Sequence, residues 1–306
     1  MKKLSGIIVF LLIVLDVYLL GKILIGGKNV QILNPQGFVA LQERNLIYLA
    51  VALMLIGAIP VFIMAIFVGR KYHANNTNAA YSPDWDHHHG LQIFFWGFLI
   101  TIMSALSVIV WVAAHQLDPH VALEPDKKPF VVQVFALRYK WLFVYPQQGI
   151  ASVNYVEFPE KTPLTFEITA SDTPMTSFWI PQLGGQIYAM SGMATQTHLI
   201  ADTVGQYRGA SSEINGDGYA DMVFTAHSVT KSDFAAWAKR VKHSPNKLTY
   251  DSFKKLSQPS IPAQVTFYSS TPDNLFTTIV MQYMAHPSTG AQAKSETMSG
   301  MNGMSK

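Results

Sequence analysis

Residues 181–193 read PQLGGQIYAMSGM, and residues 205–222 read GQYRGASSEINGDGYADM. These segments decide the fold, because short runs interrupted by proline and glycine are typical of the strands and turns of a β-sandwich. At their centre, residues 211–215 (SSEIN) offer hydroxyl, carboxylate and amide groups but no thiolate. The whole chain of 306 residues contains no cysteine. Soft copper sites need thiolate and imidazole donors, so this segment does not predict one.

Strand-like runs continue on the N-terminal side of this stretch. Residues 131–137 (VVQVFAL) and 164–168 (LTFEI) are rich in β-branched and aromatic residues and alternate in part, which predicts strands. We therefore expect residues 115–228 to form one sandwich domain. Without cysteine, that domain has no disulfides even if it is exported.

The first 114 residues hold most of the apolar excess of the chain. Overall, 49% of the residues are apolar and 13% are charged, whereas about a quarter are charged in a typical soluble protein. Residues 46–68 and 91–114 contain no Asp, Glu, Lys or Arg, and each segment exceeds the roughly 20 residues that cross a bilayer as a helix. The sequence predicts two transmembrane helices joined by the loop 69–90, and hence a membrane-anchored α+β protein. The net charge of +3 forms no basic stripe that would predict nucleic-acid binding.

The segment 1–45 allows two interpretations. Lys2 and Lys3 precede an apolar run at residues 7–15, which is typical of a signal peptide. However, Asp16 and Lys22 interrupt the continuation, and no clear small-residue cleavage site follows. A cleaved signal and a retained third helix both remain open.

The C-terminal part predicts a helical extension over residues 229–287. Residues 232–243 have Ser232 placed to cap a helix, and Phe234, Trp237 and Val241 placed on one face. A second helical segment follows at residues 249–256. The tail 288–306 is rich in Ser, Gly and Met and is predicted to be disordered.

Several long phrases, in one order, resemble subunit II of the haem–copper respiratory oxidases. They are residues 46–74 (LIYLAVALMLIGAIPVFIMAIFVGRKYHA), 138–154 (RYKWLFVYPQQGIASVN), 174–193 (PMTSFWIPQLGGQIYAMSGM) and 243–248 (HSPNKL). The resemblance runs from about residue 34 to 287 and is closest to the quinol-oxidising branch, which includes the cytochrome bo-type ubiquinol oxidases. It implies that the sandwich has a cupredoxin-like fold. Relatives in this branch often carry a lipoprotein cysteine near the N-terminus, and a chain without cysteine cannot carry that anchor.

The resemblance also identifies where copper would be bound. Copper-binding members hold a binuclear copper-A centre with two Cys, two His, one Met and a Glu carbonyl. Along this chain those positions are Thr176, Ser211, Glu213, Asn215, Tyr219 and Met222. Only Glu213 and Met222 keep the ligand identity, and they cannot hold two copper ions alone. We therefore expect no metal, cofactor-binding or catalytic residue in this chain, and a vestigial copper-A site.

Gln92 begins the second predicted span, where family members commonly have a glutamate at the mouth of a proton path into subunit I. An amide cannot titrate, so proton uptake would depend less on this position, or Asp84, Asp86 or His89 would substitute. Alternatively, Gln92 only caps the helix.

Two other clusters of His, Asp or Met residues could suggest a metal site, but both are interpreted as solvent-exposed segments. The run Asp86-His87-His88-His89 lies in the predicted loop, and adjacent His side chains point apart and rarely close a metal site. Met298, Met301 and Met304 lie in the predicted disordered tail, where no fold fixes their spacing.

The resemblance implies subunit II of a proton-pumping ubiquinol oxidase in the bacterial inner membrane. Its partners would be the other subunits of the complex, the lipid bilayer and, through the complex, ubiquinol. The haems and copper-B would lie in subunit I, and the sandwich would face the periplasm. Two alternatives remain: a cytochrome c oxidase subunit II, against which the loss of ligands argues, or a free-standing membrane-anchored binding module. Only an oxidase subunit should travel with haem through gel filtration.

Overall fold

The computed structural model describes residues 30–73, 76, 77, 88–260 and 264–285, with some of residues 11–22. It divides into two compact units: residues 42–118, and the residues up to 41 together with those from 119 onward. The described residues between 11 and 22 are helical, which a signal peptide and a retained helix both allow. The predicted disordered tail 288–306 lies outside the described residues.

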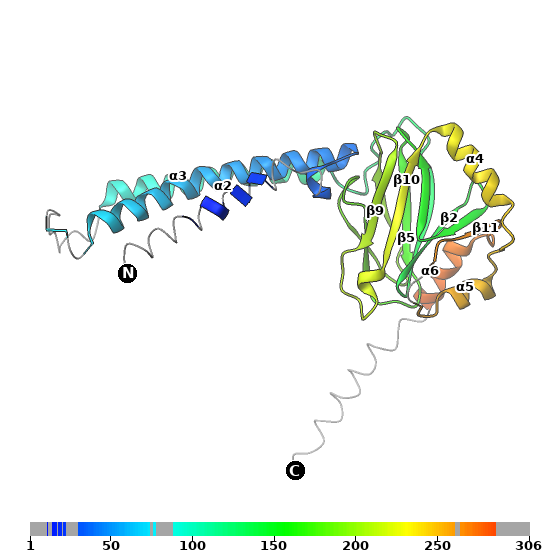
Figure 1. The fold of residues 1–306 in the computed structure, drawn as a ribbon. Coiled ribbons are helices and arrows are strands. Elements are labelled where there is room, and N and C mark those ends of the chain that lie inside the picture. Colours follow the sequence, from blue (N-terminus) through cyan, green and yellow to red (C-terminus); the bar gives the residue numbers. More distant parts are fainter. Residues whose placement is uncertain are drawn as a thin grey trace, which may run out of the picture. The chain divides into compact units, whose positions relative to one another are not determined.

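Two long helices carry the apolar N-terminal part (Figure 1). They are α2 (Phe38–Lys71) and α3 (His89–Gln116), and they contain both predicted spans. Each is long and apolar enough to cross a membrane. Their large side chains are exposed, such as Phe62 at 68% and Trp111 at 69%. A continuous apolar surface of this kind is unfavourable in water, so the structure supports a membrane anchor.

The second unit is the predicted β-sandwich, built from two mixed sheets. One sheet has the strand order β11-β3-β2-β1-β5-β8, and the other has the order β4-β10-β9-β6-β7. The first ten strands are β1 (Phe130–Leu137), β2 (Lys140–Tyr145), β3 (Ile150–Val153), β4 (Tyr155–Pro159), β5 (Leu164–Ala170), β6 (Thr176–Trp179), β7 (Ile187–Ala189), β8 (Thr195–Leu199), β9 (Gly205–Ser211) and β10 (Val223–Val229). The two strands predicted from sequence correspond to β1 and β5. The structure thus confirms the predicted fold class.

An aromatic core joins the two sheets. Phe178 of β6 and Phe224 of β10 stack with their ring centroids 5.2 Å apart and an interplanar angle of 8°. Trp141 and Phe143 of β2 meet this pair from the opposite sheet. The rings approach so closely because Gly209 of β9 has no side chain: a Cβ atom there would lie 2.0 Å from Phe224 Cζ.

The segment before α2 is part of the sandwich unit. It contains the short 3₁₀ helix η2 (Gln31–Leu33). The Gln36 N–H donates to Gln182 O at 2.8 Å, and the Ala40 N–H donates to Leu183 O at 3.1 Å. Gly37 forms a β-bridge with Ala201. Residues 1–45 were expected to form one N-terminal segment, and the packing of residues 36–40 on the sandwich is a feature that sequence patterns do not predict.

The C-terminal extension contains α4 (Lys231–Lys242), α5 (Tyr250–Leu256), β11 (Thr266–Tyr268) and α6 (Leu275–Ala285). The prediction that Ser232 caps the first helix was wrong. Thr230 is the cap: its backbone is extended, and its hydroxyl accepts from the Asp233 N–H at 3.2 Å. Ser232 already lies inside α4. Neither β11 nor α6 is predicted by the sequence patterns.

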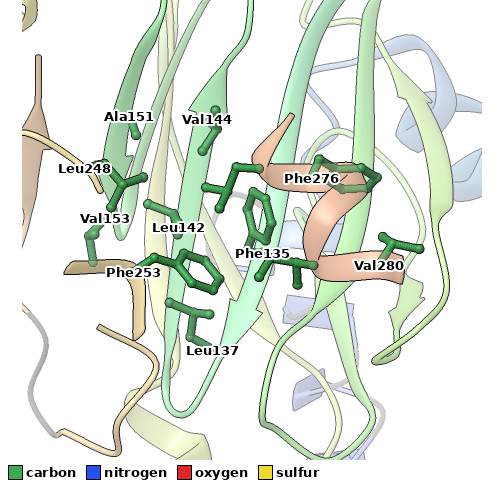
Figure 2. Close-up of a cluster of buried hydrophobic side chains, with 12 residues drawn as sticks. Phe135, Leu137, Leu142, Val144, Ala151, Val153, Leu248, Phe253, Phe276 and Val280 are labelled. Atoms are coloured by element: carbon green, nitrogen blue, oxygen red, sulfur yellow. The ribbon is translucent and has the colours of Figure 1, made fainter. Parts of the chain in front are cut away.

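The extension covers the β1–β2–β3 face of the larger sheet with a second hydrophobic cluster (Figure 2). Phe135 of β1 lies between Phe253 of α5 and Phe276 of α6, with ring centroids 5.5 and 5.6 Å away. Leu248 and Val280 also belong to this cluster. Because these side chains leave water together, the extension and the sandwich stabilise each other.

A buried lysine also ties the extension to the sandwich. Lys140, at the start of β2, is 2% exposed. Its ammonium donates to Leu256 O at 2.9 Å, Gln258 O at 2.8 Å and Ser260 Oγ at 2.5 Å. Burial lowers the pKa of Lys140, but the three acceptors match its three N–H donors. Lys140 therefore holds residues 256–260, at the C-terminal end of α5, against the sandwich.

Candidate functional site

The residues matched to copper ligands meet at one end of the smaller sheet. Thr176 begins β6, Ser211 ends β9, and Met222 directly precedes β10. These strands are neighbours in the sheet, and Phe178 of β6 faces Ser211 in register. Thr176 and Met222 are 0% exposed, and Ser211 is 8% exposed. The strand order alone thus brings together side chains from two distant parts of the chain.

A hydrogen-bond network fills the space between these residues. The hydroxyls of Thr176 and Ser211 are 2.6 Å apart. Ser211 Oγ also contacts Glu213, at 3.1 Å from its carbonyl oxygen and 3.3 Å from its amide nitrogen. The Met222 sulfur lies 4.0 Å from Thr176 Oγ1 and 3.6 Å from Asn215 Nδ2. Five of the six predicted positions therefore form one cluster.

Tyr219 is connected to this cluster through its main chain. It begins the 3₁₀ helix η3 (Tyr219–Asp221), where its carbonyl accepts from the Met222 N–H at 3.0 Å. Its own N–H donates to Gly216 O at 3.1 Å. Gly216 has a φ of 128°, a conformation that only glycine adopts without strain. The turn thus sets the path of the loop between Ser211 and Met222.

Side chains beneath the loop hold it in place. Trp141 Nε1 donates to Met222 O at 3.3 Å, which links the loop to the aromatic core. The hydroxyls of Ser177 and Ser212 lie 2.5 Å apart, and Ser212 also hydrogen-bonds Gln186. Ser212 therefore belongs to a separate polar group, although it is adjacent to Ser211 in the chain.

The donors present do not fit a copper-A centre. They are two hydroxyls, an amide, a thioether and a backbone carbonyl, whereas soft copper is held by thiolates and imidazoles. Among the residues that the structure describes, no three His, Cys, Asp or Glu side chains form a group able to hold a metal ion. Asn215 Oδ1 is a buried acceptor that has no hydrogen-bond partner in the described part of the chain, but one amide oxygen is a poor ligand for copper.

Gln92 lies in the first turn of α3 and is exposed. It does not cap the helix. The cap is His88, whose Nδ1 accepts from the Leu91 N–H at 3.0 Å, so this alternative interpretation of Gln92 was wrong. Asp84 and Asp86, proposed as substitutes for a carboxyl at position 92, lie outside the described residues.

Two family profiles match the sandwich and its extension. Residues 137–229 match the family described as "Cytochrome C oxidase subunit II, periplasmic domain". Residues 242–287 match the one described as "COX Aromatic Rich Motif". The second match covers most of the extension, including the two elements that sequence patterns did not predict.

Curated relatives match nearly the whole chain. The cytochrome bo(3) ubiquinol oxidase subunit 2 of Pseudomonas putida is 43% identical over 264 residues, which cover 86% of this chain and 84% of the relative. The ubiquinol oxidase subunit 2 of Acetobacter aceti is 39% identical over 288 residues, or 92% of this chain and 93% of the relative. Among solved structures, the periplasmic domain of cytochrome oxidase subunit II from Bradyrhizobium japonicum covers 38% of this chain and 96% of its own, with 22% identity and a TM-score of 0.36.

Proposed function

The chain belongs to the ubiquinol oxidase subunit 2 family, and on that premise we propose that it is a redox-inactive subunit II of a proton-pumping ubiquinol oxidase. The complex is an oxidoreductase that oxidises ubiquinol and reduces dioxygen to water. One observation carries the proposed role of this subunit: hydrogen-bonded hydroxyl and amide groups occupy the positions Thr176, Ser211 and Asn215 within an intact sandwich. The fold is kept and the electron-accepting chemistry is lost.

The proposed role in the complex is structural. Helices α2 and α3 would pack on subunit I within the inner membrane, and the sandwich would cover its periplasmic face. The haems and copper-B would lie in subunit I. Thr176, Ser211, Glu213, Asn215, Tyr219 and Met222 would be the remnant of a copper-A centre. At the four positions where the resemblance has thiolates or imidazoles, this chain has the hydroxyl groups of Thr176, Ser211 and Tyr219 and the amide of Asn215.

Metal analysis of the purified complex tests this proposal. We expect one copper per complex, bound in subunit I with the haems, and no near-infrared absorption band of a copper-A centre. A matched preparation of a cytochrome c oxidase should show that band under the same conditions. Additional copper that co-purifies with this chain, together with the band, would contradict the proposal.

Gln92 is proposed to replace a proton-uptake glutamate on the cytoplasmic side. A carboxyl group can exchange protons near neutral pH more readily than an amide, which does not titrate. Gln92→Glu is therefore expected to leave assembly unchanged and to speed reductive-phase proton uptake severalfold, as measured by stopped flow with a pH indicator.

Gln116→Glu is the matched control, because it makes the same change at the other end of α3. It should leave the uptake rate unchanged. If Gln92→Glu and the unsubstituted complex take up protons at the same rate at every pH, position 92 is not part of the uptake path.

A further inference from the structure

A groove of about 770 Å³ lies between α4 and the smaller sheet. We call it the α4 groove. Its walls are mainly apolar, and a few polar side chains converge at its floor, as is common in functional sites. The residues used below are Tyr155, Glu157, His227, Trp237, Arg240 and Phe267. None of them belongs to the cluster around Ser211.

Three polar side chains at the floor form a connected network. Glu157 of β4 faces His227 of β10 in the parallel pairing of these strands. The Tyr155 hydroxyl hydrogen-bonds Glu157 Oε2 and lies 2.9 Å from His227 Nδ1. His227 Nδ1 is 3.7 Å from Glu157 Oε2, and the side chains of Glu157 and His227 are 5% and 26% exposed. Hydrogen bonds through the Tyr155 hydroxyl therefore connect the carboxyl to the imidazole, and a change of charge at Glu157 is felt by all three side chains.

The network is fixed on the sandwich side. The Tyr145 hydroxyl of β2 donates to Glu157 O at 3.1 Å and accepts from the Glu157 N–H at 2.8 Å. These two bonds hold the backbone of Glu157, so its side chain starts from a fixed point beneath the groove. The charged groups that line the groove on the α4 side are Asp233 and Arg240. In the described part of the chain, Glu157 has no ion pair with Lys or Arg within 4.0 Å.

The network also contacts the extension. The ring of Tyr155 lies 6.1 Å from Trp237 of α4 and 5.8 Å from Phe267 of β11, measured between centroids. Trp237 and Phe267 are themselves 6.2 Å apart. Tyr155 thus hydrogen-bonds the buried carboxyl with its hydroxyl and packs against the C-terminal extension with its ring. A change of charge at Glu157 therefore occurs beside the contact between Tyr155 and the two aromatic rings of the extension.

We propose that Tyr155, Glu157 and His227 form a proton-binding site that controls how tightly α4 packs on the sandwich. With the proton bound, the network is neutral and the apolar walls close over it. Release of that proton to solvent leaves a net negative charge beneath Trp237. A buried charge that is only partly compensated is unfavourable and draws in water, so the proton-free network favours an opened α4.

The direction of the pH dependence follows from the surroundings of Glu157. Burial raises the pKa of Glu157, and the hydrogen bond from Tyr155 and the nearby His227 and Arg240 oppose this shift only in part. The closed state therefore binds the proton more tightly than an open, hydrated state does. By linkage, closure of α4 is favoured at low pH and weakens as pH rises through the raised pKa.

Hydrogen–deuterium exchange of the purified complex tests the proposal. The protection factor of the peptide spanning α4, corrected for the intrinsic pH dependence of exchange, is measured across a pH series. We expect it to fall as pH rises, by about tenfold for each unit by which closure raises the pKa. Glu157→Gln keeps the shape of the side chain and cannot ionise, so its α4 protection should stay high and independent of pH.

Two further variants sharpen the test. Tyr155→Phe keeps the packed ring but removes the hydrogen bond to the carboxylate, and it should move the transition to higher pH. Glu160→Gln, just beyond β4, removes a carboxylate that lies 3.9 Å from Lys161, and it should keep the wild-type profile. Wild-type protection that does not vary with pH, or a Glu157→Gln profile parallel to that of the wild type, would overturn the proposal.

Discussion

The full-length subunit carrying Thr176→His, Ser211→Cys, Asn215→Cys and Tyr219→His is expected to bind a pair of copper ions and turn purple. Glu213 would supply a carbonyl and Met222 a thioether. The unsubstituted subunit, purified in the same detergent, should bind copper only weakly and remain colourless. Copper analysis and the mixed-valence electron paramagnetic resonance signal measure the outcome.

The expectation rests on the geometry of the loop ends. Thr176, Ser211 and Met222 already lie in contact, because β6 pairs with β9 and the stacked rings of Phe178 and Phe224 support β6 and β10. Ligand positions on rigid elements can persist after the ligands are lost, provided that supporting contacts survive. One such contact is the bond from Trp141 to Met222 O. Among the residues that the structure describes, Tyr219 joins the cluster through its main chain, so Tyr219→His requires the largest adjustment.

A matched control moves one cysteine by a single residue. With Ser212→Cys in place of Ser211→Cys, the chain has the same donors, but position 212 belongs to the separate group with Ser177 and Gln186. This control should not give the mixed-valence signal. Equal copper binding by both sets would show that the fold does not direct the ligands. A folded but colourless first variant would show that the loop no longer has the ancestral geometry.

Gly209→Ala is expected to destabilise the sandwich by about 3 kcal/mol and to reduce assembly of the complex, because overpacking of a well-packed core costs up to this amount or more. The new Cβ would lie 2.0 to 2.5 Å from three ring atoms of Phe224. Phe224 cannot move away easily, since Phe178, Trp141 and Phe143 surround its ring. A typical domain is stable by only about 5–15 kcal/mol, so the loss is severe.

Thermal unfolding of the purified subunit and the amount of assembled complex in membranes measure this effect. Gly205→Ala is the control on the same strand, where the nearest atom to the new Cβ is Tyr207 Oη at 3.4 Å. That contact is ordinary, so the control should change stability by about 0.5 kcal/mol or less. Similar unfolding temperatures for the two variants would contradict the role assigned to the aromatic core.

Much of the fold was predictable because its signals are local. The charge-free runs 46–68 and 91–114 lie in the long helices α2 and α3, which are apolar enough to cross a membrane, and the β-branched runs 131–137 and 164–168 became β1 and β5. The capping residue of α4 was harder to predict, because it depends on where the backbone changes from extended to helical. That change occurs at Thr230 rather than at Ser232. The strand β11 and the helix α6 escaped prediction because their stability comes from packing on the sandwich, as for Phe276 on Phe135, rather than from a periodic pattern.

The candidate site was predictable only through resemblance. Thr176 and Ser211 are distant in sequence, so no local motif predicts that they are in contact. They meet because β6 pairs with β9. The network of Glu157 and His227 was missed for the same reason, since β4 and β10 pair although several other strands lie between them in the chain. The local sequence signal for this network is a single glutamate within an otherwise apolar strand, residues 155–159 (YVEFP).

The choice of electron donor tests the central claim most directly. Oxygen uptake by the purified complex is measured with ubiquinol and, separately, with reduced cytochrome c, using a copper-A-containing oxidase to show that the second assay works. A subunit II without thiolates or imidazoles at Thr176, Ser211, Asn215 and Tyr219 has no copper-A centre to receive electrons from cytochrome c. We predict rapid oxygen uptake with ubiquinol and only background uptake with cytochrome c. Rapid turnover with cytochrome c by the intact complex would contradict the account.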